Sequence, residues 1–206
     1  ACNCASRPWN ETTAWTVSFQ NPRINLFVSG DNRFGSLVGR SFTEAVKERP
    51  HGIFYADTLR EGLPLRRSVV EFDAEGVLES VENFYRQSEQ RPARFFRCGN
   101  EDYALVAAQP GVDSRWLEEL TAESVRRLDQ AEELGLLEQR RYRWRCGCDE
   151  QKMLGVLMPV FRVEGESLFD GEATVRIQCP RCGARFVVTR EALEAYMANV
   201  ADSAEE

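Results

Sequence analysis

The chain has 206 residues, 43% of them hydrophobic, which is enough for one ordinary core and a small additional domain. Its 33 acidic and 26 basic side chains leave a formal charge of -7, which disfavours nucleic acid as a partner because phosphate groups would be repelled. No apolar run approaches the ~20 residues that cross a bilayer, and the opening ACNCASRPWNE lacks the order of a signal peptide. We therefore expect no membrane partner.

The front half alternates strand and helix patterns. A helix is predicted for residues 41–49, which Ser41 caps and Pro50 ends, and another for residues 75–87, where apolar residues recur at helical spacing. Apolar residues also alternate with polar ones, which is typical of strands. Strands are predicted near residues 15–19, 24–28, 53–55 and 68–72, and as a pair at 94–98 and 103–107.

Residues 113–135 show helical periodicity among many charges, with Gly135 as the stop. In the QRRYRWR that follows, an extended chain would place Tyr142 and Trp144 on one face and the last three arginines on the other. A solvated strand face is therefore favoured over a nucleic-acid stripe. A last helix is predicted for residues 191–199, capped by Thr189.

Seven cysteines is an odd number, and the chain is too long to need disulfides as staples. We therefore expect reduced thiols and a cytoplasmic protein. Four of the cysteines form two short pairs, in RWRCGCDEQ and in IQCPRCGARF. Two such pairs on separate loops supply the tetrahedral thiolate ligands that zinc prefers. The pattern predicts that one zinc ion is bound by Cys146, Cys148, Cys179 and Cys182.

Several other interpretations of the cysteine pairs stay open. The zinc could be a static staple of a constitutive zinc-ribbon module that binds proteins or regulates them. A disulfide-only module is disfavoured because the residues between Cys148 and Cys179 are too polar to bury much unaided. A thioredoxin-like motif is disfavoured because Gly183 and a strand-like run follow Cys182. A nucleic-acid-binding ribbon conflicts with the acidic charge.

The C-x-C element favours a switch over a staple. Thiolates two residues apart can form a strained disulfide once an oxidant removes them from the metal. Because zinc binding supplies ~10 kcal/mol or more of a small domain's folding free energy, its loss is expected to unfold that domain. Redox chemistry would thereby expose apolar surface, including the stripe on residues 113–135.

These motifs resemble the redox-regulated heat-shock chaperones known as the 33 kDa chaperonin family. In that family a C-x-C and a C-x-x-C flank a spacer of about this length. SVVEFDAEGVLESVENFYRQSEQRPARFF is similar to the family segment in which a strand leads into a helix ending in SEQ, and CPRCGARFVVTREALEAY is similar to its closing segment. The resemblance covers roughly residues 61–199, whereas RINLFVSGDNRFGSLVGRSF corresponds more weakly to the family's sheet.

The resemblance implies an ATP-independent holdase chaperone that is activated by cysteine oxidation and zinc release and binds unfolding proteins. It further implies that the reduced zinc ligands become two disulfides, Cys146 with Cys148 and Cys179 with Cys182, and that the oxidised protein forms a homodimer. No enzymatic activity is expected. The resemblance does not extend to client binding by the front portion, because only about sixty residues precede the match and the family's α/β portion is larger.

The expected fold class is α+β: a mixed α/β N-terminal domain, a helical linker and a small C-terminal zinc-binding domain. The expected domains are a shortened substrate-binding-like domain at residues 1–112, a linker at 113–145, a redox-switch domain at 146–200 and a disordered tail at 201–206.

Other candidate sites are weaker. Cys2 and Cys4 form a second C-x-C, but terminal residues are usually mobile. Cys98 is expected to be half-buried at a strand end rather than to act as a nucleophile with His51, the single histidine. Gly30–Gly35 lacks the lysine of a phosphate-binding loop, because Ser36 stands at that position.

Overall fold

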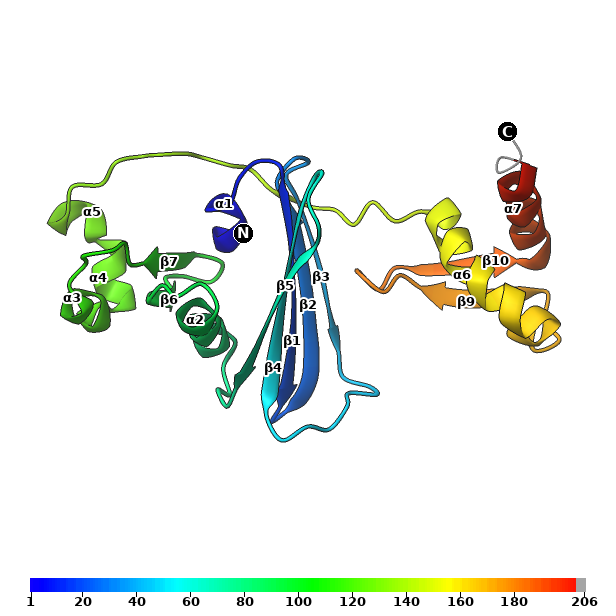
Figure 1. Cartoon of the computed structure of the whole chain (residues 1–206), viewed down its shortest axis with the longest axis horizontal. Coiled ribbons are helices and arrows are strands. Elements are labelled where there is room, and N and C mark those ends of the chain that lie inside the picture. Colours follow the sequence, from blue (N-terminus) through cyan, green and yellow to red (C-terminus); the bar gives the residue numbers. More distant parts are fainter. Residues whose placement is uncertain (203–206) are drawn as a thin grey trace. The chain divides into compact units, whose positions relative to one another are not determined.

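The computed structural model describes residues 1–202 and forms two compact units, residues 1–145 and a second unit that begins at Cys146 (Figure 1). Helices and strands are mixed in both, as an α+β protein requires. Among the described residues, no helix combines the length and apolar character needed to cross a membrane. Of the predicted tail, Ala201 and Asp202 continue the last helix, and residues 203–206 lie outside the described residues.

The first unit is built on a six-stranded sheet with the order β5-β4-β1-β2-β3-β8. Neighbouring strands are antiparallel except β8, which runs parallel to β3. The four strands predicted in this region are confirmed and are longer than expected, and β3 and β8 join them. The strands are β1 (Glu11–Gln20), β2 (Arg23–Asp31), β3 (Ser36–Phe42), β4 (Gly52–Arg60), β5 (Arg66–Phe72) and β8 (Arg143–Trp144).

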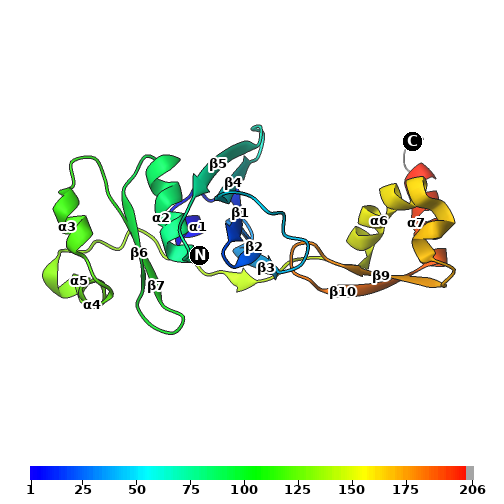
Figure 2. The same ribbon diagram turned by 90° about the horizontal axis from the view of Figure 1, so that it is seen from below.

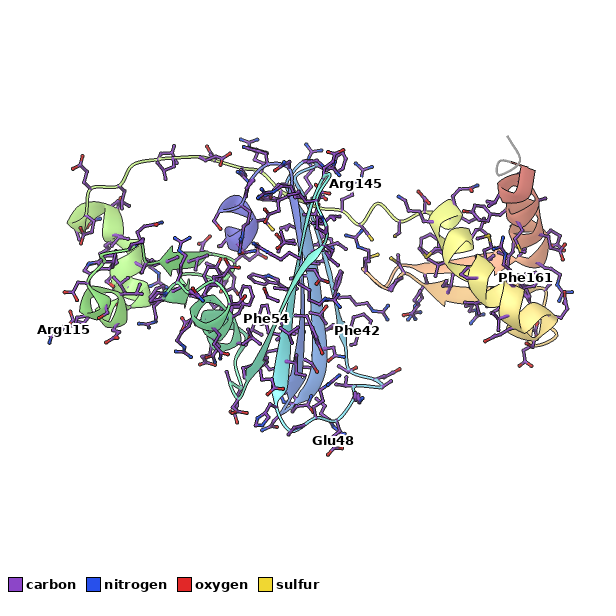
Figure 3. The ribbon with its side chains drawn as sticks, in the orientation of Figure 1. Phe42, Glu48, Phe54, Arg115, Arg145 and Phe161 are labelled. Atoms are coloured by element: carbon purple, nitrogen blue, oxygen red, sulfur yellow. The ribbon has the colours of Figure 1, made fainter. Side chains whose placement is uncertain are left out.

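One face of this sheet holds the main core. The helix α2 (Val77–Gln87) packs on it, and the ring of Phe84 stacks on that of Phe54 with centroids 4.7 Å apart. Phe54 lies on the side of the sheet that α2 covers, whereas Phe42 lies on the other side (Figure 3). The predicted helix 75–87 is confirmed, because its apolar spacing supplies the side chains that close this core.

The predicted helix 41–49 is wrong. Ser41 and Phe42 instead extend β3, pairing with Leu26 and Asn25 of β2. The following residues have no regular structure. They offer few apolar side chains to bury, and the side chain of Gln20 binds their backbone by accepting a hydrogen bond of 2.9 Å from the Arg49 N–H. Ladder hydrogen bonds therefore prevail over a helix that has no core-facing stripe.

A smaller layer follows on the same side of the sheet as α2, as Figure 2 shows from below. The predicted strand pair is confirmed as an antiparallel hairpin, and three short helices pack against it around Phe96, Leu117 and Leu120. The elements are α1 (Cys2–Ala5), β6 (Ala93–Arg97), β7 (Tyr103–Ala107), α3 (Ser114–Glu119), α4 (Ala122–Arg126) and α5 (Leu128–Ala131).

The continuous helical pattern of residues 113–135 is therefore divided. Leu120 adopts an extended conformation with φ -60° and ψ 138°, which ends α3. Thr121 then starts α4 with a capping box shared with Ser124, so the chain changes direction while keeping its apolar side chains on the hairpin. Local capping chemistry and packing against β6 outweigh helix continuity here.

The second unit has its own core. The helix α6, which the sequence pattern did not predict, buries Met153, Leu154 and Leu157. The segment between the cysteine pairs therefore buries more apolar side chains than its polar composition indicates. The predicted last helix is confirmed, with Thr189 Oγ1 accepting a hydrogen bond of 3.1 Å from the Ala192 N–H. The elements are α6 (Glu150–Glu164), the 3-10 helix η1 (Gly165–Phe169), β9 (Thr174–Gln178), β10 (Arg185–Thr189) and α7 (Arg190–Asp202).

Candidate metal centre

The first cysteine pair lies immediately before α6. Asp149 caps this helix by accepting a hydrogen bond of 2.9 Å from the Lys152 N–H, and the Lys152 ammonium donates to the carbonyl of Gly147. Gly147 has φ +70°, a conformation that favours glycine, and it lets the chain turn between Cys146 and Cys148. The cap and the turn together fix the direction of both thiols.

The second pair lies in the turn between β9 and β10. The Cys179 N–H donates to the carbonyl of Ala184 at 2.8 Å, and the Gly183 N–H donates to the carbonyl of Cys179 at 2.9 Å. Gly183 has φ +76°, as a tight turn of this kind requires. The two strands therefore hold Cys179 and Cys182 at the tip of a rigid hairpin.

The structure brings the four predicted ligands together. All four Sγ atoms of Cys146, Cys148, Cys179 and Cys182 lie within 4.8 Å of one another. The Sγ atoms of Cys146 and Cys179 are 3.7 Å apart, and those of Cys148 and Cys182 are 3.5 Å apart. Zinc–sulfur bonds of about 2.3 Å in a tetrahedron set sulfur separations of about 3.8 Å. The cluster therefore has the size that holds a tetrahedral metal ion.

Four thiols this close cannot all ionise without a cation. Burial, together with the neighbouring thiol of Cys182, raises the pKa of Cys148 to about 12. Burial would also raise the pKa of Cys179, but hydrogen bonds from the backbone N–H groups of Arg181 and Cys182 outweigh it and lower that pKa to about 7. A bound dication would lower the pKa of all four thiols, because it stabilises every thiolate at once.

The cluster is partly open to solvent. Cys179 is 2% exposed, while the other three cysteines are half-buried. A pocket of about 220 Å³ is lined by Cys146, Cys148 and Cys179, and by Lys152, Met153 and Val156 of α6. A small oxidant or chelator can therefore approach the cluster through this pocket.

The other cysteines lie outside this cluster. Cys4 is buried, and burial raises the pKa of its thiol. Cys2 Sγ lies 3.7 Å from the carbonyl oxygen of Tyr103. Cys98 is half-buried and packs against the core around Phe96, as expected. His51 contacts Asp73, with 2.7 Å between Nδ1 and Oδ1, and this contact argues against a catalytic pair with Cys98.

The sequence pattern missed a polar anchor ahead of the cysteines. It placed Arg141, Arg143 and Arg145 on a solvated face and assigned no role to Arg140, whose side chain is 5% exposed. Its guanidinium donates to the carbonyl of Arg7 at 2.7 Å and lies 4.1 Å from the centroid of the Trp9 ring. No pattern within the sequence signals this contact, because its partners are far apart along the chain.

Comparisons with known proteins all find similarity to the same family. The sequence model of the Hsp33 protein matches residues 98–189, which contain all four cysteines of the cluster. The chain is similar to the 33 kDa chaperonin of Photorhabdus laumondii subsp. laumondii, with 23% identity over 84% of this chain and 65% of that protein. It is also similar to the 33 kDa chaperonin of Pectobacterium atrosepticum, with 26% identity over 59% of this chain and 50% of that protein. The chain thus spans about half to two thirds of these curated relatives.

The fold is similar to the crystal structure of the 33 kDa chaperonin of Thermotoga maritima, with a TM-score of 0.67 and 15% identity. This likeness covers 97% of the chain and 81% of that structure, so it includes the front sheet, for which the sequence motifs gave only a weak correspondence. The three similarities, joined by a thiol cluster that meets the geometry of a metal centre, make the chain similar to the 33 kDa chaperonin (Hsp33) family in sequence and in fold.

Proposed function

We propose that the protein is a redox-regulated, ATP-independent holdase. In the reduced state the thiolates of Cys146, Cys148, Cys179 and Cys182 hold one zinc ion, and the protein is inactive. A hydroperoxide oxidant then takes two electrons from each of two cysteine pairs, forming two disulfides and releasing zinc. The observation that supports this proposal is the gathering of four sulfur atoms within 4.8 Å of one another.

The identity of the disulfides follows from the family resemblance, which pairs Cys146 with Cys148 and Cys179 with Cys182. The two short sulfur contacts in the structure run between the loops instead, from Cys146 to Cys179 and from Cys148 to Cys182. Peptide mapping of the oxidised chain distinguishes the two patterns. Peptides linked within each loop support the proposed pairing, and peptides linked between the loops contradict it.

Loss of the metal is expected to unfold the second unit. Its core is small, with Leu154, Leu157, Phe169, Val188 and Leu193 as its buried residues. Domains of this size have little stability of their own, and a structural zinc ion adds ~10 kcal/mol or more of binding free energy to folding. The proposed active state therefore exposes apolar surface, to which unfolding client proteins bind.

The principal rival is a constitutive zinc-ribbon interaction module, in which the metal is only structural. The 2% exposure of Cys179 favours this rival, because a buried thiol resists oxidation. The pocket lined by Cys146, Cys148 and Cys179 favours the switch. Zinc release measured against thiol loss under mild peroxide separates them, since a staple keeps its zinc while the chain stays folded.

The decisive experiment is the aggregation of a thermally unfolding client in the presence of this chain, reduced or treated with peroxide. We expect suppression only after oxidation. Cys182→Ser should abolish the difference between the two states, whereas Cys98→Ser, outside the cluster, should preserve it. Equal suppression in both states, or none in either, contradicts the proposal. Sedimentation of the same samples tests whether oxidation produces a homodimer.

The cytoplasm is the compartment proposed for this function, because its reducing poise keeps the four thiols available to the metal until stress.

A further inference from the structure

The strand β8 covers only one end of the sheet's outer edge. Arg143 and Trp144 pair with Ser36 and Leu37 of β3. The Arg143 N–H donates to the carbonyl of Gly35, and the Arg145 N–H donates to the carbonyl of Leu37, both at 2.8 Å. The odd-numbered residues of β3 therefore direct their backbone groups outward.

The rest of β3 continues this edge without a strand beside it. By the two-residue period of a strand, the backbone groups of Gly39 and Ser41 point outward like those of Leu37. Within the described residues, β8 is the element paired on this side of β3, and it ends at Trp144. An exposed row of this kind is a template for one more strand.

An apolar pocket adjoins the same edge. It has a volume of about 150 Å³, and its lining includes Trp15, Val28, Leu37 and Trp144. Val28 is 45% exposed and Trp144 is 70% exposed, so apolar surface borders the pocket. A cavity of about this volume accommodates a single benzene-sized ring.

Gly39 adapts the edge to an aromatic side chain. A Cβ atom there would lie 2.7 Å from the carbonyl oxygen of Phe27 and 3.3 Å from the Trp144 ring. Without that atom, the Trp144 ring lies directly against the strand. Leu37 is opposite Trp144 in the register, and Gly39 is opposite Val28. The β8 segment is thus an intramolecular example of what this edge accepts: an extended backbone with a large aromatic side chain.

We propose that the outer edge of β3 from Leu37 to Ser41, with the pocket beside it, docks an extended segment of an unfolding protein that carries an aromatic side chain. The inference rests on the proposed holdase function and gives it a location. Backbone hydrogen bonds at Gly39 and Ser41 bind any sequence, and the pocket selects for one ring. The strand β8 competes with the client, so release of β8 lengthens the free edge.

The test uses a fluorescein-labelled peptide with the sequence of residues 140–145, RRYRWR, and the full reduced chain. The peptide RRYRAR has the same charge and controls for nonspecific attraction to the acidic protein. Arg143→Pro removes the N–H that binds Gly35 and should release β8. We expect this variant to bind RRYRWR at least about tenfold more tightly than the wild type does, and more tightly than it binds RRYRAR.

Two further substitutions in the Arg143→Pro chain locate the site. Val28→Asp places a charge at the pocket, and Ser41→Pro removes an outward N–H while sparing the ladder to β2. Val28→Asp should weaken binding about tenfold, whereas Ser41→Pro should leave it unchanged when the peptide takes the register of β8, in which Trp144 is opposite Leu37. Val69→Asp is the matched control, because Val69 is 54% exposed on β5 at the opposite edge of the sheet. Ser41→Ala controls for Ser41→Pro, and if the proline variant does not fold, Val28→Asp decides.

Equal binding of the two peptides, or binding that Val28→Asp leaves unchanged, overturns the docking site. A wild-type dimer that Val28→Asp dissociates also overturns it, because a second copy would then occupy the edge. The peptide assay needs no oxidation, so it is independent of the proposed switch. If oxidation switches on suppression of aggregation but peptide binding is not selective, the docking site alone is refuted. If peptide binding is selective but suppression does not depend on oxidation, the switch alone is refuted.

Discussion

The hydroxyl of Tyr142 donates a hydrogen bond of 2.7 Å to Oδ1 of Asn32, a residue that is only 2% exposed. The amide of Asn32 in turn donates to the carbonyls of Cys4 at 3.0 Å and Pro8 at 2.8 Å. The buried side chain of Asn32 thereby joins the segment just ahead of the cysteine cluster to the first residues of the chain. Satisfied polar contacts of this kind are costly to break, because a partner left buried loses its hydration.

Tyr142→Phe removes only the hydroxyl of Tyr142 and leaves Oδ1 of Asn32 without this hydrogen bond. We expect the free energy of unfolding of the first unit to fall by about 1 to 3 kcal/mol, measured by urea titration. Tyr103→Phe is the control, because Tyr103 is 49% exposed, and it should change the free energy by less than about 0.5 kcal/mol. Equal effects of the two substitutions would show that the Asn32 contact contributes no stability.

Metal affinity should depend steeply on pH. The pKa of Cys148, raised to about 12 by burial and the neighbouring thiol of Cys182, means that this thiol keeps its proton from pH 6 to 8 until a metal displaces it. Each displaced proton lowers affinity by about tenfold per pH unit as the pH falls. Competition with a zinc chelator at pH 6, 7 and 8 measures this slope. A flat profile would mean that zinc is not held by these thiols.

The second unit should depend on its metal when its core is weakened. Leu193 is 0% exposed, and Leu193→Ala is expected to cost about 2 to 5 kcal/mol. Without metal the variant should unfold, as the wild type is expected to, and with zinc it should stay folded because metal binding adds to folding, but melt at a lower temperature than the zinc-loaded wild type. Circular dichroism with and without chelator tests this. Val187→Ala, at a site 59% exposed, should behave like the wild type.

His51 offers a pH measurement far from the cysteines. Its hydrogen bond to Asp73 raises the pKa of the imidazole above the ordinary value of 6.5. The charged pair thus favours the folded state below about pH 6.5, and that contribution is lost as the pH rises through the raised pKa. NMR titration of this single histidine should give a lower midpoint in Asp73→Asn than in the wild type. An unchanged midpoint would exclude the contact in solution.

The elements that the sequence predicted well have strong local signals. The strand pair at β6 and β7, the helix α2 and the cap at Thr189 follow from alternation, helical spacing and a side-chain acceptor, which act over a few residues. The incorrect helix at residues 41–49 also had local signals, but it had no apolar stripe for the core. Its first residues therefore extended β3 along β2. Helix α6 was missed because its apolar residues become a core only against β10 and α7.

The sequence by itself determined the four cysteines and the turn glycines beside them, because ligand type and loop spacing are local properties of the chain. Only the tertiary structure decided that their sulfur atoms meet within 4.8 Å. It alone also placed Tyr142 on Asn32 and Trp144 beside Gly39, at separations that no local pattern encodes. Such contacts arise when packing brings distant segments together and buried polar groups must find partners, so they are decided by the folded chain as a whole.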